Sequence, residues 1–428
     1  MKGKELALRA IPALLAAAFA GHAGASGFQL LEQNASGLGN SYAGSAAVAD
    51  NASTIYFNPA GMTQLQAREV SLGINAVKPS FKFNNGNSAT GGLSGDGGDG
   101  GDWAFVPNAY LSWALNKDLY VGLGIGAPFG LVTEYENPWV GAAHSRKFEI
   151  KTININPSIA YRVNDKVSLG VGLNWQKLEA EYIRTVGIAS AGLRGSTATM
   201  ELDDSAWGWN IGALFNVSPT TKVGVSYRSA IEYKATGNVK VTGPSPALNA
   251  AGTSDVKADI EFPDTVVLSA TQDLSDRWQL LGDLSWTGWS SIPKVDIYRT
   301  SGAGDGTIAQ TLETKFRDTW RVALGANYKL DDAWKLKFGI AYDQSPVHNA
   351  DDRLTALPDN NRFWFSTGAQ WKPNKAATVD LGLAYLYIKD TDINNDQRSA
   401  NPLLNRGLVN GTYDSSIWIL GAQYSMAF

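Results

Sequence analysis

The sequence has no cysteine, only three histidines among 428 residues, and few charged residues, 18% in all. The absence of cysteine excludes a disulfide scaffold and a thiolate metal site. The longest apolar run, residues 11–20, is shorter than the roughly 18 residues that a membrane-spanning helix needs. The formal charge of −4 argues against a basic nucleic-acid-binding surface. What remains is a β protein rich in glycine (45 residues) and tryptophan (14 residues).

The N-terminus has the three parts of a secretory signal. Lys2, Lys4 and Arg9 precede or enter an apolar stretch, which is followed by Ala23-Gly24-Ala25. A basic region, an apolar core and an A-x-A cleavage site in this order are typical of signal peptides. A short buried helix is the alternative, but the flanking charges disfavour it. We therefore predict that residues 1–25 are a Sec-type signal peptide.

The rest of the chain divides at residue 67. Residues 26–67 are small and polar and show no sustained alternation, although short helices are expected near 43–50 and 59–65. From residue 68 onward the hydrophobicity has a period of two, as in 166–175, which places alternate side chains on opposite faces of a strand. About fourteen such segments occur, near 68–83, 103–115, 118–128, 147–163, 166–185, 200–216, 222–237, 256–273, 277–300, 310–330, 333–344, 361–372, 376–389 and 412–428.

The connections between these segments alternate between short and long. Tight turns contrast with long stretches at 84–102, 129–146, 186–199, 238–255, 301–309, 345–360 and 390–411. Short turns at one rim, long loops at the other and an even strand number are typical of bacterial outer-membrane barrels. The chain also ends on an aromatic residue, Phe428. A soluble sandwich alternates too, but gives no reason for segregated loop lengths. We predict an all-β, transmembrane antiparallel barrel over residues 68–428, located in the bacterial outer membrane.

Several ionisable residues fall on the inward phase of their strands. By alternation Arg184, Arg317, Arg321, Asp343 and Arg362 point into the lumen. An inward arginine cluster can bind carboxylates through charge-assisted hydrogen bonds. The alternative is that arginine–aspartate pairs simply fill a polar lumen.

The third strand carries Gly122, Gly124 and Gly126 on its inward face. Glycine in a strand often marks a kink or bulge. Close packing against the N-terminal segment explains the row equally well.

Signals for catalysis or metal binding are weak. Asp96, Asp99 and Asp102 in the 94–102 run could ligate calcium, but the run lacks a bidentate glutamate at the right distance, which favours a solvated loop. The histidines outside the signal peptide, His144 and His348, fall in expected loops, and no G-x-S-x-G motif occurs. We predict that the protein is not an enzyme and that it uses no cofactor or metal.

The chain after residue 25 resembles, nearly end to end, the FadL/TodX family of outer-membrane long-chain fatty acid transporters. The similar segments are GFQLLEQNASGLGNSYAGSAAVADNAST, APFGLVTEYENPWVGAA, SYRSAIEYKATG and YDQSPV…PDNNRFWFS, together with Asn58-Pro59-Ala60. Several matches in the right order make the resemblance specific, whereas the NPA motif alone would not.

This resemblance implies a fourteen-stranded barrel plugged by a small N-terminal helical hatch, residues 26–67. It also implies passive uptake of hydrophobic molecules. An extracellular apolar groove would include Ile188, Leu193 and Leu248. The interior pocket would use the basic residues Arg184, Arg317 and Arg362, with Asp343 nearby. Rearrangement of the hatch near Asn58, Pro59 and Ala60 would open a path. Lateral exit would follow a kinked third strand, at Gly122, Gly124 and Gly126.

Three hypotheses for function remain open. The first is uptake of long-chain fatty acids, the second is uptake of neutral aromatic hydrocarbons or similar hydrophobic small molecules by the same fold, and the third is a general aqueous porin. The expected partners are the hydrophobic cargo, outer-membrane lipids and the barrel assembly machinery. We expect a monomer that does not bind nucleic acid.

Overall fold

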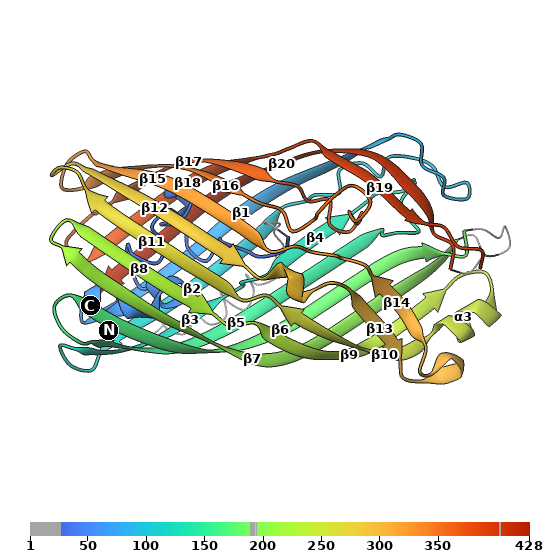
Figure 1. The fold of residues 1–428 in the computed structure, drawn as a ribbon, viewed down its shortest axis with the longest axis horizontal. Coiled ribbons are helices and arrows are strands. Elements are labelled where there is room, and N and C mark those ends of the chain that lie inside the picture. The colour runs from blue at the N-terminus through green and yellow to red at the C-terminus, as the bar shows by residue number, and fades with distance from the viewer. Residues whose placement is uncertain (1–26, 189–192, 194, 402–403) are drawn as a thin grey trace, which may run out of the picture.

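The computed structural model describes residues 27–188, 193, 195–401 and 404–428, which form a closed antiparallel barrel with a plug inside it (Figure 1). The predicted signal peptide, residues 1–25, lies outside the described residues. The first and last strands, β1 and β20, close the barrel by pairing from Glu69↔Ala427 to Asn85↔Gly411. None of the described helices is long and apolar enough to cross a membrane.

Twenty strand segments make up fourteen barrel strands, as the alternation predicts. Six barrel strands are interrupted once, and each consists of two consecutive segments: β3 with β4, β8 with β9, β10 with β11, β12 with β13, β14 with β15, and β18 with β19. The bounds are β1 Arg68–Asn85, β2 Ala104–Ala114, β3 Leu119–Gly126, β4 Gly130–Glu134, β5 Lys147–Arg162, β6 Val167–Val186, β7 Ser196–Ser218, β8 Thr221–Arg228, β9 Ile231–Thr242, β10 Ser254–Phe262, β11 Thr265–Asp273, β12 Trp278–Thr287, β13 Val295–Arg299, β14 Ile308–Leu312, β15 Thr319–Lys329, β16 Trp334–Asp343, β17 Arg362–Trp371, β18 Ala377–Ile388, β19 Thr391–Gln397 and β20 Gly407–Ala427.

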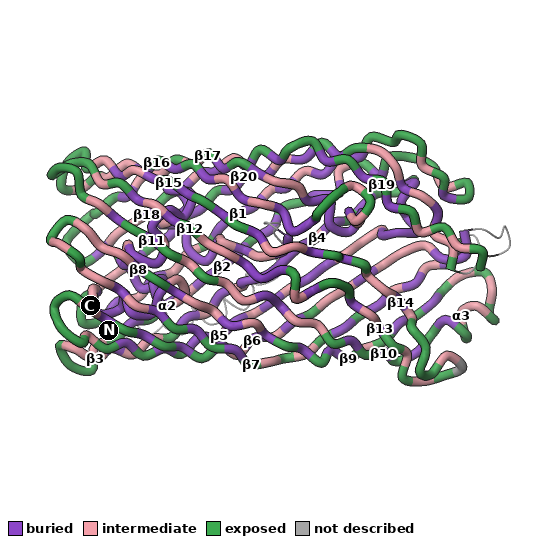
Figure 2. Tube along the Cα trace, viewed as in Figure 1, coloured by how far each residue is buried: buried purple, intermediate pink, exposed green. Residues whose placement is uncertain are grey.

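The outer face carries an apolar band between two rows of aromatic side chains, as expected for a barrel in a bilayer. Exposed and buried residues alternate along the strands (Figure 2). The row nearer the short turns includes Trp113, Tyr161, Trp278, Trp334, Trp371 and Phe428. The row nearer the long loops includes Trp207, Trp320, Phe363, Tyr387 and Trp418. Beyond this second row, β5, β6, β7, β9 and β10 continue toward the long-loop end (Figure 1).

The predicted 129–146 loop contains β4, and two further predicted loops are shorter than the sequence suggests. The 238–255 stretch contains the end of β9, the helix α3 (Pro246–Gly252) and the start of β10. The 390–411 stretch contains β19 and the start of β20, which pair as a hairpin. In both cases the strands extend past the membrane, where the polar residues that suggested loops face water.

The hatch lies inside the barrel, near the short-turn end (Figure 1). It contains the 3-10 helices η1 (Leu38–Asn40) and η2 (Pro59–Gln64) and the short helix α2 (Thr54–Phe57). The helix expected near 59–65 is thus present as η2, capped by the side chain of Asn58, which accepts a hydrogen bond from the Ala60 N–H. The prediction of a helix near 43–50 is wrong, because residues 43–47 form turns. The Ser45 and Ala46 N–H groups donate to Asp283 and Ser269 on the barrel wall instead.

Inward glycines let the hatch approach the wall. A Cβ at Gly122 would lie 2.5 Å from Met62 Sδ, and one at Gly224 would lie 2.0 Å from Ala46 O. The row on the third strand therefore accommodates the hatch, as one of the two explanations holds, and the strand is also interrupted directly after Gly126.

Candidate functional site

An apolar cavity of about 80 Å³ lies in the half of the lumen nearer the long loops. Six strands contribute side chains, and the segment at 354–357 adds Leu354 and Leu357. The strand residues are Ile150, Leu178, Met200, Ile260, Ile297 and Leu312. Ligand pockets are typically about 300 Å³ or larger. A long acyl chain would therefore have to displace flexible side chains such as Met200 and Leu354.

Two arginines lie just beyond this cavity. On β6, Leu178 and Tyr182 line the cavity, and Arg184 is the next inward residue. Arg184 Nε and Arg406 Nη2 both donate to Gln310 Oε1, at 3.1 and 2.6 Å. Within the described part of the chain no carboxylate pairs with either guanidinium. Two like charges that share one neutral acceptor provide a site where an anion would be favourable.

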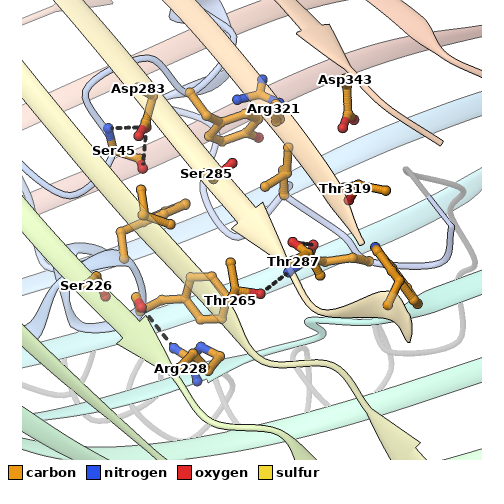
Figure 3. A pocket seen from close by; sticks show the side chains of 17 residues that line it. Ser45, Ser226, Arg228, Thr265, Asp283, Ser285, Thr287, Thr319, Arg321 and Asp343 are labelled. Carbon is orange, nitrogen blue, oxygen red and sulfur yellow. Dashed lines mark hydrogen bonds between the residues drawn. The ribbon is translucent and has the colours of Figure 1, made fainter. Parts of the chain in front are cut away.

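A second, polar cavity of about 70 Å³ lies between the hatch and the strands β8, β11, β12 and β15 (Figure 3). Two of its charged groups, Asp283 and Arg228, contact the hatch. Asp283 accepts hydrogen bonds from the Ser45 N–H and hydroxyl, at 3.0 and 2.7 Å. Arg228 donates to Tyr56 O at 2.8 Å and lies over the Tyr56 ring, 4.2 Å from its centroid. This cavity joins the plug to the wall.

A buried charge cluster adjoins the polar cavity. Arg362 pairs with Asp359, and Asp343 is opposite Arg362 in the β16–β17 register. Arg321 donates to Ser41 O at 2.6 Å. Glu32, from the hatch, is completely buried beside these arginines. Burial raises the pKa of Glu32 to about 7, and the nearby charges of Arg362 and Arg321 only partly oppose the shift.

Four aromatic rings separate the two cavities. Phe28, from the N-terminal segment, contacts Trp289, Phe262 and Phe129, with ring centroids 4.7, 5.0 and 5.9 Å away. Phe28 lines the apolar cavity, whereas Trp289 lines the polar one. Phe28 therefore lies between the two cavities.

The barrel wall has an opening at the interruption of its third strand. The β2–β3 pairing ends at Ala109↔Ile125, and β4 pairs with β5 alone. Past this point the Glu134 N–H reaches Gly100 O at 3.0 Å. Between these two contacts, a passage of about 50 Å³ is lined by inward residues such as Ile150 and by outward ones such as Phe105. Because it touches both faces of the same sheet, the passage lies within the wall.

The N-terminal segment covers this opening from inside. Gln29 is opposite Phe129 in a short antiparallel pairing, in which the Leu30 N–H donates to Pro128 O at 2.7 Å and the Gly130 N–H donates to Phe28 O at 2.8 Å. Leu30 and Phe129 both line the passage. A displacement of residues 28–30 would thus connect the apolar cavity with the outside of the wall.

The structure does not gather the predicted basic residues in one place. Arg184 points inward, in the direction that the alternation predicts, and meets Arg406. Arg362 and Asp343 lie with Glu32, on the hatch side of the aromatic rings. Arg317 is half-buried and its Nε donates to Ser345 O at 3.2 Å, while the preceding residue, Phe316, lines the apolar cavity. Arg317 therefore lies in the segment that precedes β15, which begins at Thr319.

The other predicted residues have packing or capping contacts. Ile188 is buried and Leu193 is half-buried, while Leu248 on α3 packs against the apolar cluster that surrounds the cavity. Asn58 donates to Ala46 O and Ala213 O, at 2.7 and 3.0 Å, and thereby joins two parts of the hatch to β7.

Pro59 and Ala60 approach the wall closely, since a Cβ at Gly170 would lie 2.3 Å from Ala60 N. Gly124 is near Tyr110, and Gly126 is the last residue of β3, directly before the wall opening.

The aspartates of the 94–102 run shape their own loop. Asp96 accepts from the Gly98 N–H, Asp99 accepts from the Phe81 and Gly101 N–H groups, and Asp102 pairs with Lys78 at 3.3 Å. No group of three acidic or histidine side chains among the described residues is placed to hold a metal ion. His144 is buried in the loop after β4, and burial lowers its pKa to about 4.

Comparisons with known proteins agree with this architecture. Residues 16–428 match the family described as "Outer membrane protein transport protein (OMPP1/FadL/TodX)". The chain is 31% identical to Outer membrane protein P1 of Haemophilus influenzae, over 93% of this chain and 94% of that protein. It is 27% identical to the long-chain fatty acid transport protein of Escherichia coli K12, over all of both chains.

Two solved structures have a similar fold. A Pseudomonas aeruginosa FadL homologue superimposes with a TM-score of 0.83 at 24% identity, covering 94% of this chain and 99% of that one. The CymD monoaromatic hydrocarbon channel superimposes with a TM-score of 0.68 at 19% identity, with the same coverage.

Proposed function

Because this chain belongs to the OMPP1/FadL/TodX family of outer-membrane transporters of hydrophobic compounds, we propose that its cargo is long-chain fatty acids. The observation that carries the proposal is the pairing of the apolar cavity with Arg184 and Arg406 at its outer end. An acyl chain would occupy the cavity, and its carboxylate would meet the two guanidinium groups. A relative that matches over all of both chains carries the name of a long-chain fatty acid transport protein.

The route that we propose continues through the wall. Cargo would reach the cavity from the loops that carry Ile188, Leu193 and Leu248. Displacement of residues 28–30, together with a rearrangement of the hatch, would then expose the passage between β2 and β5. An acyl chain that leaves sideways stays out of water, and each CH₂ group gains about 0.8 kcal/mol in the bilayer.

The alternative cargo is a neutral aromatic hydrocarbon. The observation in its favour is the lining of the cavity by Phe28, Phe148, Phe262 and Phe316, together with the similar fold of a monoaromatic hydrocarbon channel. A neutral ring would use the apolar walls and leave the two arginines unused.

Direct binding to the purified protein distinguishes the two cargoes. Oleate, methyl oleate and toluene would be titrated in detergent. The proposal predicts that oleate binds more tightly than its methyl ester, because only the acid offers a charge to Arg184 and Arg406. Equal affinity for acid and ester would remove the carboxylate site, and tight binding of toluene alone would favour the alternative.

A further inference from the structure

The outer mouth of the wall opening has two unlike rims. The passage ends on the outside between Phe105 of β2 and the outward residues Lys151, Ile153, Lys177 and Glu179 of β5 and β6. Phe105 is exposed on the outer face of β2, and Ile153 is half-buried. One rim is therefore apolar, and the other carries two ammonium groups together with the carboxylate of Glu179.

The height of the mouth follows from the sheet register. Trp175 on β6 is paired with Trp207 on β7, and both belong to the row of aromatic side chains nearer the long loops. Lys177 is the next outward residue beyond Trp175 in the direction of the long loops, and it is opposite Ile153. Aromatic rows mark the boundary between hydrocarbon and headgroups. The lysines thus lie at headgroup depth, directly above apolar residues that face the hydrocarbon.

We propose that Lys151 and Lys177 form an exit site that holds the carboxylate of a departing fatty acid while its acyl chain enters the outer leaflet. This inference rests on the proposed cargo and assigns a second, separate carboxylate contact, outside the barrel. An amphiphile needs both rims of the mouth. A neutral hydrocarbon needs only the apolar one, so the exit would discriminate between the two kinds of cargo.

The present partners of the lysines can be exchanged for a ligand. Lys177 Nζ is 2.6 Å from Glu179 Oε1, and the two side chains are 39% and 53% exposed. Exposed ion pairs of this kind are weak, because water and salt screen them. Lys151 pairs with Glu149, which Lys147 also contacts at 2.6 Å. If Lys151 turned to a ligand carboxylate, Glu149 would keep its contact with Lys147, which also pairs with Glu181.

Glu179 provides a test with the opposite sign. Its carboxylate lines the same mouth and forms an ion pair with the ammonium group of Lys177. Replacing it with glutamine would free the ammonium group and remove a negative charge that repels the departing anion. The exit site therefore predicts slower delivery without the lysines and faster delivery without Glu179.

The experiment compares cellular uptake of labelled oleate and labelled methyl oleate by the full-length protein. We expect the double variant Lys151→Gln, Lys177→Gln to take up oleate about threefold more slowly, the size expected when screened ion pairs are lost. Methyl oleate uptake should be unchanged, and Glu179→Gln should raise oleate uptake. Lys257→Gln removes an exposed lysine of β10 that does not line the mouth, and should change neither.

The affinity of the purified double variant for oleate separates this inference from the proposed function. Unchanged affinity with slowed uptake supports the exit site. Unchanged oleate uptake overturns it, and so does an equal loss for acid and ester, which would mean that the substitutions deform the opening. If Lys257→Gln also slowed oleate uptake, the effect would come from the overall surface charge, and the exit site would be overturned. If the wild-type protein binds no oleate, the proposed function fails first.

Discussion

The two luminal cavities have nearly equal volumes, about 80 and 70 Å³, but only the second is lined by several charged side chains. The polar cavity contains Asp283 and Arg228, which contact the hatch and also the wall residues Ser269 and Asn174. The apolar cavity is enclosed mainly by aliphatic and aromatic side chains, whose dispersion and hydrophobic contacts are individually weak and non-directional. The contacts around the polar cavity therefore hold the hatch in one place. The apolar cavity, in contrast, can bind and release a ligand.

The largest effect is expected from locking the N-terminal segment over the wall opening. Gln29 and Phe129 are directly opposite in a pairing whose hydrogen bonds flank them, which brings the Cα atoms within disulfide range. The natural chain has no cysteine, so Gln29→Cys with Phe129→Cys would form a single bridge. Oxidation should abolish oleate uptake, and reduction should restore it.

Uptake that is unaffected by oxidation would show that cargo leaves the apolar cavity by another route. Oleate binding to the oxidised protein is the companion measurement, and it should persist if the bridge blocks exit rather than the cavity.

The next largest effect is expected from displacing the hatch from the barrel wall near the polar cavity. Gly224→Leu would place a side chain against the hatch, since even a Cβ would lie 2.0 Å from Ala46 O. The hatch should be displaced, and ion conductance in planar bilayers should rise well above that of the wild type. Gly282→Ala is the matched control on β12, where the nearest atom to the added Cβ is Leu324 Cδ2, 3.9 Å away. High conductance in the wild type would instead support a general porin.

A change in side-chain polarity should affect ligand affinity in the apolar cavity but not in the polar one. Leu178→Asn buries an amide in the apolar cavity, where an unsatisfied polar group costs about 1–3 kcal/mol. Binding of oleate and of methyl oleate should weaken together, because the cost falls on the acyl chain. Ser285→Ala in the polar cavity should change neither affinity. Equal effects of the two variants would contradict the division of roles.

The smallest effect concerns Glu32. Its pKa is raised from 4.5 to about 7, so the folded protein binds more protons than the unfolded chain between these pH values. Stability contributed by this group therefore falls as the pH rises from about 4.5 to 7. Glu32→Gln should raise the melting temperature at pH 8 relative to the wild type and leave it nearly unchanged at pH 4.5. The opposite order would mean that Glu32 is ionised and held by the arginines.

The sequence predicts the barrel well, because alternation is a local property of each strand. The same alternation gives the direction of Arg184, whereas Arg317 precedes the first residue of β15 and lies outside the pattern of that strand. Arg406 is missed, because it lies in a long loop and only the folded structure brings it to Gln310. The wall opening cannot be predicted from the hydrophobic alternation of β2. A strand that lacks a hydrogen-bonded neighbour still points alternate side chains to opposite faces.

The central claim is that Arg184 and Arg406 bind the carboxylate of an acyl chain held in the apolar cavity. The most direct test is the affinity of the variant Arg184→Gln, Arg406→Gln for oleate and for methyl oleate, by isothermal titration of the purified protein. The account predicts that oleate affinity falls about tenfold, or about 1.4 kcal/mol, to the level of the ester, while ester affinity stays constant. An unchanged preference for oleate over its ester would contradict it.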